Sequence, residues 1–402
     1  MGARCARPAD RALSPPPVSQ EPPNFTLADL RKAVPPHCFK RSLLRSSAYL
    51  AADCCGAALL YVAVRAADAL PMPLALRVAL WLAYTVAQGA VCTGIWVVAH
   101  ECGHGAFSEV RTRWRCFAAR RVWARPHASL LLRQHPVVND TVGFVFHSAL
   151  LVPYFSWKFS HARHHAGTGS LERDEVFVPP TREQHEAEAP SSSVLVRAAL
   201  LVGTLLVGWP LYLVKNAGSR KYAGRHADHF WPWSPVFRPG RERALVALSD
   251  VGLLATAAVL RRAAAASSWS WVARAYFAPY LVVNAFLVLI TLLQHTHPAL
   301  PHFAGSEWEW LRGACSTVDR SYGAVLNALH HHIADTHVCH HLFSTMPHYH
   351  AQEATEALKG VLGRYYCRDD RNIVAAMWAD WRSCTFVDGD EGGNDKVLWF
   401  RA

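Results

Sequence analysis

Four apolar stretches, each long enough to cross a lipid bilayer as a helix, constrain the fold of this chain more than any other feature. They lie near 47–64, 78–98, 194–214 and 276–294, and the second contains no charged residue. A membrane-crossing helix needs about 20 predominantly apolar residues. A buried core helix in a water-soluble protein would explain one such stretch but not four. We therefore expect an all-α integral membrane protein with four transmembrane helices.

Two further apolar stretches, near 142–157 and 246–260, are shorter than a membrane-crossing helix requires. The second contains Asp250 and is bounded by Arg243 and Arg261. A charged side chain is costly at the centre of a bilayer. We therefore expect both stretches to form interfacial or half-buried helices rather than additional crossings.

Composition excludes several other classes of protein. Hydrophobic residues make up 51% of the chain and charged residues 18%, so most of it is not disordered. The 11 cysteines include no Cys-x-x-Cys pair, which argues against a disulfide scaffold. The net charge of +11 is largely local, because residues 110–134 contain seven arginines and no acidic residue, and no nucleic-acid partner is expected. Residues 1–23 form a head rich in proline and serine that we expect to be disordered.

Histidine is the unusual residue type, with 23 in the chain, and eight of these fall into three clusters. On a helix, positions i, i+3 and i+4 share one face, so each cluster can direct two or three imidazoles toward one point. Eight imidazoles can hold two metal ions, and imidazole suits iron, zinc, copper and nickel. The clusters are His100 and His104; His161, His164 and His165; and His337, His340 and His341.

The order of the clusters along the chain places them on the same side of the membrane. The first directly follows the stretch at 78–98, the second precedes that at 194–214, and the third follows that at 276–294. With four crossings, all three lie on the side of the N-terminus, whereas a fifth crossing at 246–260 would move the third cluster to the opposite side. The sequence thus predicts a histidine-rich cap that holds two metal ions at one membrane face.

The first cluster also matches another metal motif. The segment from His100 to His104 fits His-Glu-x-x-His, in which a zinc peptidase uses the glutamate as its base. A zinc peptidase does not explain the other two clusters. Cys102 and Cys339 lie inside clusters, and we interpret them as small spacers because thiolate ligands favour zinc.

Five further residues near the clusters are candidates for ligands or supporting groups. His295 and His297 close the last apolar stretch and are either additional ligands or interfacial anchors. Metal-bound imidazoles usually donate their second N–H to a carboxylate or a carbonyl. The candidates for that role beside the second and third clusters are Asp174, Glu175 and Asp335.

Several segments, taken together, closely resemble the plant microsomal oleate Δ12 (omega-6) fatty acid desaturases, which are membrane histidine-box desaturases. The resemblance covers about 24–109 and 135–400, and it indicates one desaturase domain over 24–400. The segments that support it are Phe25 to Phe39, Ala99 to His104, Val152 to His165, Thr168 to Pro179, Leu293 to Pro298 and Asp335 to His350.

The resemblance implies an enzyme of the endoplasmic reticulum membrane whose histidines face the cytosol. It implies two iron ions bound by the eight clustered histidines, with His295 as a ninth ligand. Such an enzyme would use O2 to convert an oleoyl chain on a membrane lipid, phosphatidylcholine in this family, to linoleoyl. Electrons would come from a separate cytochrome b5 and its NADH-dependent reductase, since the chain has no His-Pro-Gly-Gly haem motif. A homo- or hetero-oligomer is left open.

Departures from the family leave two alternatives open. Cys339 stands where alanine is usual, and Gly105 replaces a common histidine. In relatives, changes near the boxes accompany hydroxylation and other modified outcomes, so a fatty acid hydroxylase is an alternative of the same class. The C-terminal segment from Lys396 to Ala402 lacks the usual form of the family's aromatic tail. The second alternative is a catalytically impaired, metal-binding isoform, which the arginine-rich insert would produce.

That insert, residues 110–134, is the largest departure, and removing it restores the family spacing between His104 and His161. Valine codons begin with GT and a glutamine codon can end with AG, so the ends of the block, Val110 and Gln134, permit a retained intron that keeps the reading frame. A genuine loop that binds anionic lipid headgroups through its arginines is the competing interpretation.

The insert generates the first prediction. In yeast, a form without residues 110–134 should make more linoleate than the full-length chain, because the apolar side chains of the insert would need burial near two histidine clusters. Gas chromatography of the fatty acids measures the difference at matched expression. Equal linoleate from both forms would show a tolerated loop, and uniform inclusion of codons 110–134 in spliced messenger RNA would refute the intron.

Overall fold

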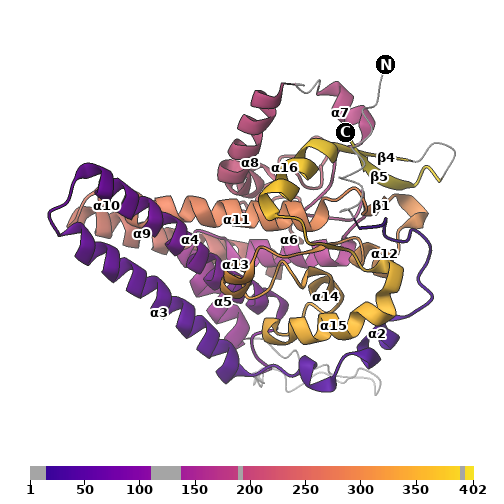
Figure 1. Ribbon diagram of the computed structural model, residues 1–402, viewed down its shortest axis with the longest axis horizontal. Coiled ribbons are helices and arrows are strands. Elements are labelled where there is room, and N and C mark those ends of the chain that lie inside the picture. Colours follow the sequence, from indigo (N-terminus) through magenta and orange to yellow (C-terminus); the bar gives the residue numbers. More distant parts are fainter. Residues whose placement is uncertain (1–14, 110–136, 189–192, 390–393) are drawn as a thin grey trace, which may run out of the picture.

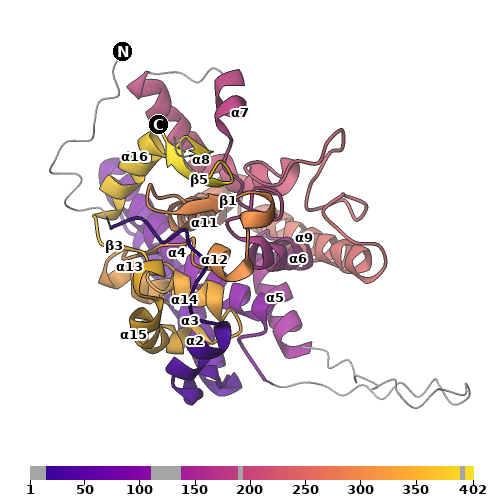
Figure 2. The same cartoon turned by 90° about the vertical axis from the view of Figure 1, so that its right-hand side faces the viewer.

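The computed structural model describes residues 15–109, 137–188, 193–389 and 394–402. The arginine-rich insert and the first 14 residues of the head therefore lie outside the described residues. Long helices extend from a cap of short helices and strands gathered at one end (Figure 1), and a view turned by 90° looks onto this cap, with the long helices behind it (Figure 2). The predicted all-α membrane architecture is confirmed, because few residues of the described chain lie in strands.

Four segments run between the cap and the far end of the bundle. Helix α3 begins beside the cap, where Ser42 N–H donates to the Tyr349 hydroxyl at 2.8 Å. At the far end, the Trp81 indole donates to Asp68 at 3.1 Å and packs edge-on against Trp271, with 5.2 Å between ring centroids. The four segments are α3 (Leu43–Asp68), α4 (Leu74–His104), α9 (Arg241–Ala266) and the continuous run of α10 (Trp269–Val272), a π-helical turn (Ala273–Phe277) and α11 (Ala278–His295).

Helix α9 differs from the sequence-based expectation that 246–260 is interfacial. It is 26 residues long, and the described residues contain five helices, rather than four, that by length and composition could cross a membrane. Its first turn lies level with the second histidine cluster, because Glu242 pairs with Arg163. It ends beside α10 at the far end of the bundle. Flanking arginines lengthened this helix beyond its apolar centre, since their aliphatic stems can lie along the bundle while the charges reach water.

Helix α8 (Val194–Lys215) is the long apolar helix that does not run along the bundle. Near its start, Arg197 C=O accepts a hydrogen bond from Trp381 of α16 (Ile373–Ser383) in the cap. Near its end, the Tyr212 hydroxyl lies 2.9 Å from that of Ser160 on α6. Both ends are thus at the cap, and α8 crosses α11 (Figure 1), where Gly208 approaches Val288. Helix α8 has the length and composition expected of a crossing helix at 194–214, whereas α9 is the fourth segment that runs along the bundle.

Close packing sets the relative position of α4 and α11. A Cβ atom on Gly89 would lie 2.4 Å from the Cβ of Val282, so only glycine allows the two helices to approach this closely. The Tyr84 hydroxyl donates to Ala275 C=O at 2.9 Å farther from the cap. Helix α4 then ends at Gly105, whose φ of +73° is the left-handed conformation that favours glycine at a helix C-terminus.

The cap is held to the end of α11 by a buried arginine. Arg320 donates to the backbone carbonyls of Leu293 at 2.9 Å and Thr296 at 3.0 Å, and it pairs with the carboxylates of Asp369 and Asp380. Its charge is therefore fully compensated in a site from which water is excluded. The remaining helices of the described residues are α2 (Leu27–Ala33), α5 (Val137–Ala149), α6 (Tyr154–Gly167), α7 (Arg182–Ala187), α12 (Trp310–Ala314), α13 (Ala324–Leu329), α14 (His337–Leu342) and α15 (Ala351–Leu362). The 3-10 turns are Pro36–Phe39, Gly305–Glu307, His348–His350 and Gly363–Tyr365. The strands form the sheet β1–β5–β4 (Pro301–Phe303, Val397–Arg401, Phe386–Gly389) and the parallel pair β2–β3 (Asp319–Arg320, Arg368–Asp369).

Part of the head is ordered, contrary to expectation. Val18 is buried and its N–H donates to Ala299 C=O at 2.8 Å, while Gln20 C=O accepts from Arg312. One apolar side chain and these backbone hydrogen bonds dock residues 15–23 against the cap, which composition alone did not indicate.

The fold generates a topology prediction. Glycosylation acceptors with flexible spacers, inserted between Ser267 and Ser268 or between Ala223 and Gly224, should report opposite sides of the membrane, because α9 separates the two sites. Glycosylation of only one of the two insertion variants, measured by a mobility shift that glycosidase removes, is the expected result. If α8 crossed the membrane and α9 did not, both acceptors would lie on the same side.

Candidate metal centre

All nine histidines proposed from the sequence as ligands converge where α4, α6, α11 and α14 meet. Helix α4 supplies the first cluster from its last turn, α6 supplies the second, and α14 supplies the third. His295 is the last residue of α11. Seven of the nine side chains are buried, and His104 and His161 are partly buried. The histidines divide into two groups.

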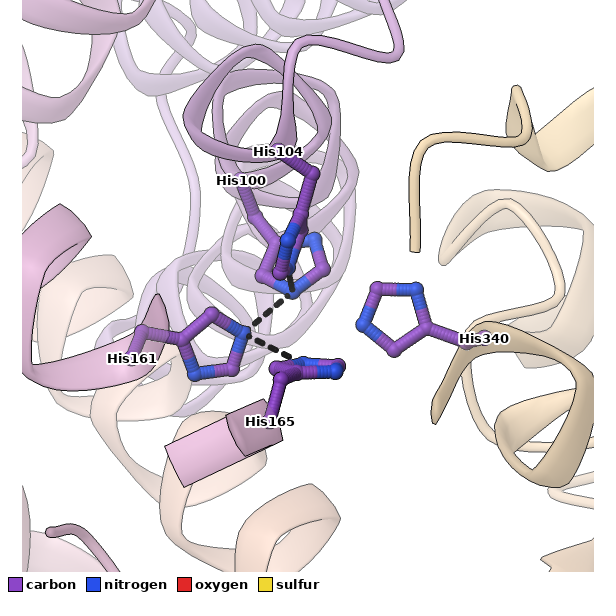
Figure 3. A group of neighbouring side chains, drawn as sticks. All are labelled: His100, His104, His161, His165 and His340. Atoms are coloured by element: carbon purple, nitrogen blue, oxygen red, sulfur yellow. Dashed lines mark hydrogen bonds between the residues drawn. The ribbon is translucent and has the colours of Figure 1, made fainter. Parts of the chain in front are cut away.

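The first group consists of His100, His104, His161, His165 and His340, whose ligand atoms all lie within 4.8 Å of one another (Figure 3). The Nε2 atom of His100 lies 2.9 Å from that of His161 and 3.2 Å from that of His104. The Nε2 atoms of His161 and His165 are 3.2 Å apart. His340 faces these four rings from the opposite side, so the five imidazoles surround one point.

The second group consists of His164, His295 and His341, and His337 adjoins it. The Nε2 atom of His295 lies 3.2 Å from that of His164 and 3.3 Å from that of His337. His337 and His341 approach within 3.1 Å through the same atoms. The rings of His165 and His341 stack with 4.2 Å between centroids, so the two groups are adjacent.

Helix geometry explains why each His-x-x-His-His cluster serves both groups. Successive residues are about 100° apart around a helix, so positions i and i+4 differ by about 40° and positions i+3 and i+4 by about 100°. His161 and His165 accordingly face the first group, and His164 faces the second. In α14 the pair His337 and His341 faces the second group and His340 the first.

The arrangement fits two metal ions. Metal–nitrogen bonds of about 2.0–2.1 Å place neighbouring ligand nitrogens about 3 Å apart, which matches the observed separations of 2.9–3.3 Å. Within the described chain, the buried Nε2 atom of His340 has no hydrogen-bond partner, although it points toward the first group. A buried imidazole nitrogen without a partner is unfavourable unless a cation accepts its lone pair.

Neighbouring groups fix the ring orientation in the second group. Asp174 accepts a hydrogen bond from Nδ1 of His164 at 2.8 Å, and the backbone carbonyl of Ile333 lies 3.2 Å from Nδ1 of His337. The hydroxyl of Thr168 lies 3.2 Å from Nδ1 of His341. In each ring this leaves Nε2 free to face the centre of the group.

The other two carboxylates proposed as supporting groups bond elsewhere. Glu175 accepts a hydrogen bond from Tyr222 at 2.6 Å, and Asp335 pairs with His332 at 2.9 Å. His297, the alternative ligand, lies 3.8 Å from Asp369, in the charge cluster around Arg320.

Sequence analysis missed two carboxylates at the site. Glu101 was considered only as a peptidase base, but it is buried beside Nδ1 of His100 (3.5 Å) and of His340 (3.9 Å). An acidic residue at the end of a membrane helix is costly unless it is paired. The position of Glu101 at the end of an apolar stretch could therefore have indicated that its carboxylate has a partner. Asp319 accepts from the N–H of Val338 at 2.8 Å and so holds α14; no local pattern marks it.

Burial keeps five imidazoles on α6 and α14 neutral. It lowers the pKa of His161, His165, His340 and His341 well below its usual value, and that of His337 to about 3, with neighbouring histidines adding to the effect. A neutral imidazole is the form that binds a metal ion. The site is therefore prepared for metal binding at neutral pH.

Apolar helices that end in two adjacent groups of imidazoles define a membrane protein with histidine clusters able to bind metal. Residues 77–371 match the sequence model of the family described as fatty acid desaturase. The chain belongs to the fatty acid desaturase family.

Relatives in this family cover nearly the whole chain. A Delta(12)-acyl-lipid-desaturase of Punica granatum is 50% identical over 391 residues, which is 96% of this chain and 93% of the relative. An omega-6 fatty acid desaturase of Glycine max, endoplasmic reticulum isozyme 2, is 48% identical over 98% of this chain and 96% of its own length. An oleoyl-12-hydroxylase of Ricinus communis is 47% identical over 94% of this chain and 91% of the relative.

The neutral imidazoles predict acid-sensitive stability of the metal-free protein. At pH values between the lowered pKa of these imidazoles in the folded protein and their ordinary pKa near 6.5, the unfolded chain binds more protons than the folded chain. The free energy of unfolding should therefore fall as the pH is lowered from about 7 to about 5, by up to about 1.4 kcal/mol per pH unit for each such imidazole. Burial raises the pKa of Asp319 to about 7 and also raises the pKa of Glu175 and of Asp380, so these carboxyl groups oppose the trend.

Thermal unfolding of the metal-free protein in detergent measures this dependence. His337→Gln should make the pH dependence shallower, because it removes one such imidazole, whereas His226→Gln should not, because the His226 side chain is 67% exposed. A melting temperature that does not change over this pH range would contradict the prediction.

Proposed function

We propose that this chain is an acyl-lipid Δ12 desaturase, which uses O2 to convert an oleoyl chain on phosphatidylcholine to linoleoyl. The observation that carries the proposal is the convergence of nine histidines into two adjacent, buried groups at the end of an apolar helical bundle. The names of the relatives from Punica granatum and Glycine max support the regiochemistry.

The reaction explains why such a site is needed. An unactivated C–H bond of an acyl chain is not broken by general acid–base catalysis, and protein side chains supply no oxidant. Two iron ions, when bound, would supply the oxidising chemistry with O2. One O2, two electrons, two protons and the two hydrogens of the acyl chain give the double bond and two waters. The all-nitrogen donor set suits an oxygen-activating iron pair better than a thiolate site would.

The residues of the chain would hold and orient the two ions. His100, His104, His161, His165 and His340 would bind one, and His164, His295, His337 and His341 the other.

Asp174 and the carbonyl of Ile333 would keep Nε2 of two rings directed at the second ion. Indole rings cover the first group, since Trp157 stacks on His161 at 4.6 Å and Trp96 on His100 at 5.5 Å. These apolar walls exclude water from the reacting atoms.

The electrons would come from cytochrome b5 and its NADH-dependent reductase, because the chain has no haem motif of its own. We place the enzyme in the endoplasmic reticulum membrane with the cap facing the cytosol, where a cytosolic donor can reach it. The relatives from Glycine max are named as endoplasmic reticulum isozymes, which supports the compartment.

A hydroxylase is the second candidate, and one observation favours it. The Ricinus communis relative, an oleoyl-12-hydroxylase, is almost as similar to the chain as the desaturases are. Histidine ligands alone do not separate the two outcomes, because both reactions begin by removing a hydrogen from the same region of the acyl chain. The identity of the product separates them.

Expression in yeast tests the proposal. A form without the insert should produce linoleate, measured by gas chromatography with mass spectrometry. His337→Gln should lower the product by more than about 100-fold, the upper end of the loss that removing an outer-shell partner causes. A hydroxylated fatty acid would instead assign the second candidate, and no new product from well-expressed protein would refute both.

His332→Asn is the matched control for the loss of product. His332 lies in the same segment, is partly exposed and pairs with Asp335 rather than with either group. Its φ of +61° is a conformation that asparagine tolerates. The control should therefore retain product, and an equal loss in both variants would show that disruption of the segment, not ligand removal, abolishes the reaction.

A further inference from the structure

We propose that His37, Cys38, His350 and Glu353 form a separate binding site for a divalent cation of the zinc class. The residues come from two segments that are far apart in the sequence. His37 and Cys38 lie on the 3-10 turn Pro36–Phe39 just before α3. His350 ends the 3-10 turn His348–His350 directly before α15, and Glu353 lies in the first turn of α15. The site goes beyond the proposed desaturase activity and does not depend on it.

The donor atoms of the four side chains all lie within 4.8 Å of one another. Nε2 of His37 is 2.9 Å from Oε2 of Glu353 and 3.7 Å from Sγ of Cys38. The rings of His37 and His350 pack edge-on with 5.3 Å between centroids. Four donors therefore surround one point, which is the number that a tetrahedral zinc site requires.

The donor chemistry selects the cation. Two imidazoles, one thiolate and one carboxylate are the ligand types that zinc accepts. Thiolate and carboxylate together balance a charge of +2. With bonds of about 2.3 Å to sulfur and about 2.0 Å to nitrogen, a tetrahedral ion places the sulfur and the nitrogen about 3.5 Å apart, close to the 3.7 Å between Sγ of Cys38 and Nε2 of His37. Calcium and magnesium, which prefer oxygen donors, do not fit this set.

The setting combines a fixed donor with adjustable ones. Cys38 is fully buried in an apolar cluster with Leu30 and Leu358, so its position is set by packing. The side chains of His37 and Glu353 are 53% and 51% exposed, so a hydrated cation can reach them and both can rotate to close the site. The guanidinium of the nearby Arg45 stacks on Tyr349, 4.2 Å from the ring centroid.

A cation here would join the segment before the first bundle helix to α15, which packs behind the third histidine cluster. Val338 of α14 and Leu358 of α15 share one buried cluster with Cys38. The site would therefore hold the N-terminal segment against the back of α14, away from the faces that carry His337, His340 and His341.

Cobalt substitution tests the site, because a thiolate–cobalt bond gives a near-ultraviolet charge-transfer band that imidazole ligands do not give. Full-length protein purified in detergent should develop this band on titration with Co2+ and lose it when Zn2+ is added. Cys38→Ser should abolish the band. Cys339→Ala and Cys102→Ala are the matched controls, since both cysteines lie within the histidine clusters, and both variants should retain it.

A second variant, Glu353→Gln, tests the site even if Cys38→Ser fails to fold, because Glu353 is on the surface and its replacement does not disturb the buried core. This variant should keep the band and raise the Co2+ concentration needed for half-saturation by about 10-fold or more. The absence of any cobalt–thiolate band in the folded full-length protein would overturn the proposal. A band that survives Cys38→Ser, or half-saturation unchanged by Glu353→Gln, would overturn it as well.

Discussion

The structure depends on how nine imidazoles can share a buried space. Their Nε2 atoms approach one another to about 3 Å, and in His164 and His337 the Nδ1 atom faces Asp174 or a backbone carbonyl, so that Nε2 presents its lone pair to the neighbouring rings. Such an arrangement is unfavourable unless cations lie between the nitrogens. The elements that surround the site can therefore be understood as supports that hold the rings in place against this repulsion.

These supports act on backbone as well as on side chains. Arg320 holds the last turn of α11 through the carbonyls of Leu293 and Thr296, and it thereby fixes the position of His295. Asp319, its neighbour in sequence, holds the N–H of Val338 in α14. Two adjacent residues of the short strand β2 thus position two of the four ligand-bearing helices. The ion pairs of Arg320 with Asp369 and Asp380 make this anchor rigid.

Sequence predicted the parts of the site that follow from spacing, and missed those that follow from packing. The histidine clusters and the all-α membrane class follow from periodicity and apolar length. The sequence does not show that α9 runs along the bundle while α8 lies across it, because both have the length and composition of a crossing helix. It does not show which group each histidine joins, since that depends on how α6 and α14 are rotated. Glu101 and Asp319 act across long sequence separations, which no local pattern records.

The position of α8 has a consequence for the surrounding lipid. Both of its ends lie at the cap, whereas α3, α4, α9 and α11 run to the far end of the bundle. An apolar helix in this position displaces acyl chains in one leaflet and none in the other. The protein therefore has a larger cross-section in the leaflet beside the cap than in the other leaflet, so its profile across the bilayer is that of a wedge. Lipid packing, and with it membrane curvature, is thereby coupled to the packing of α8 on α11.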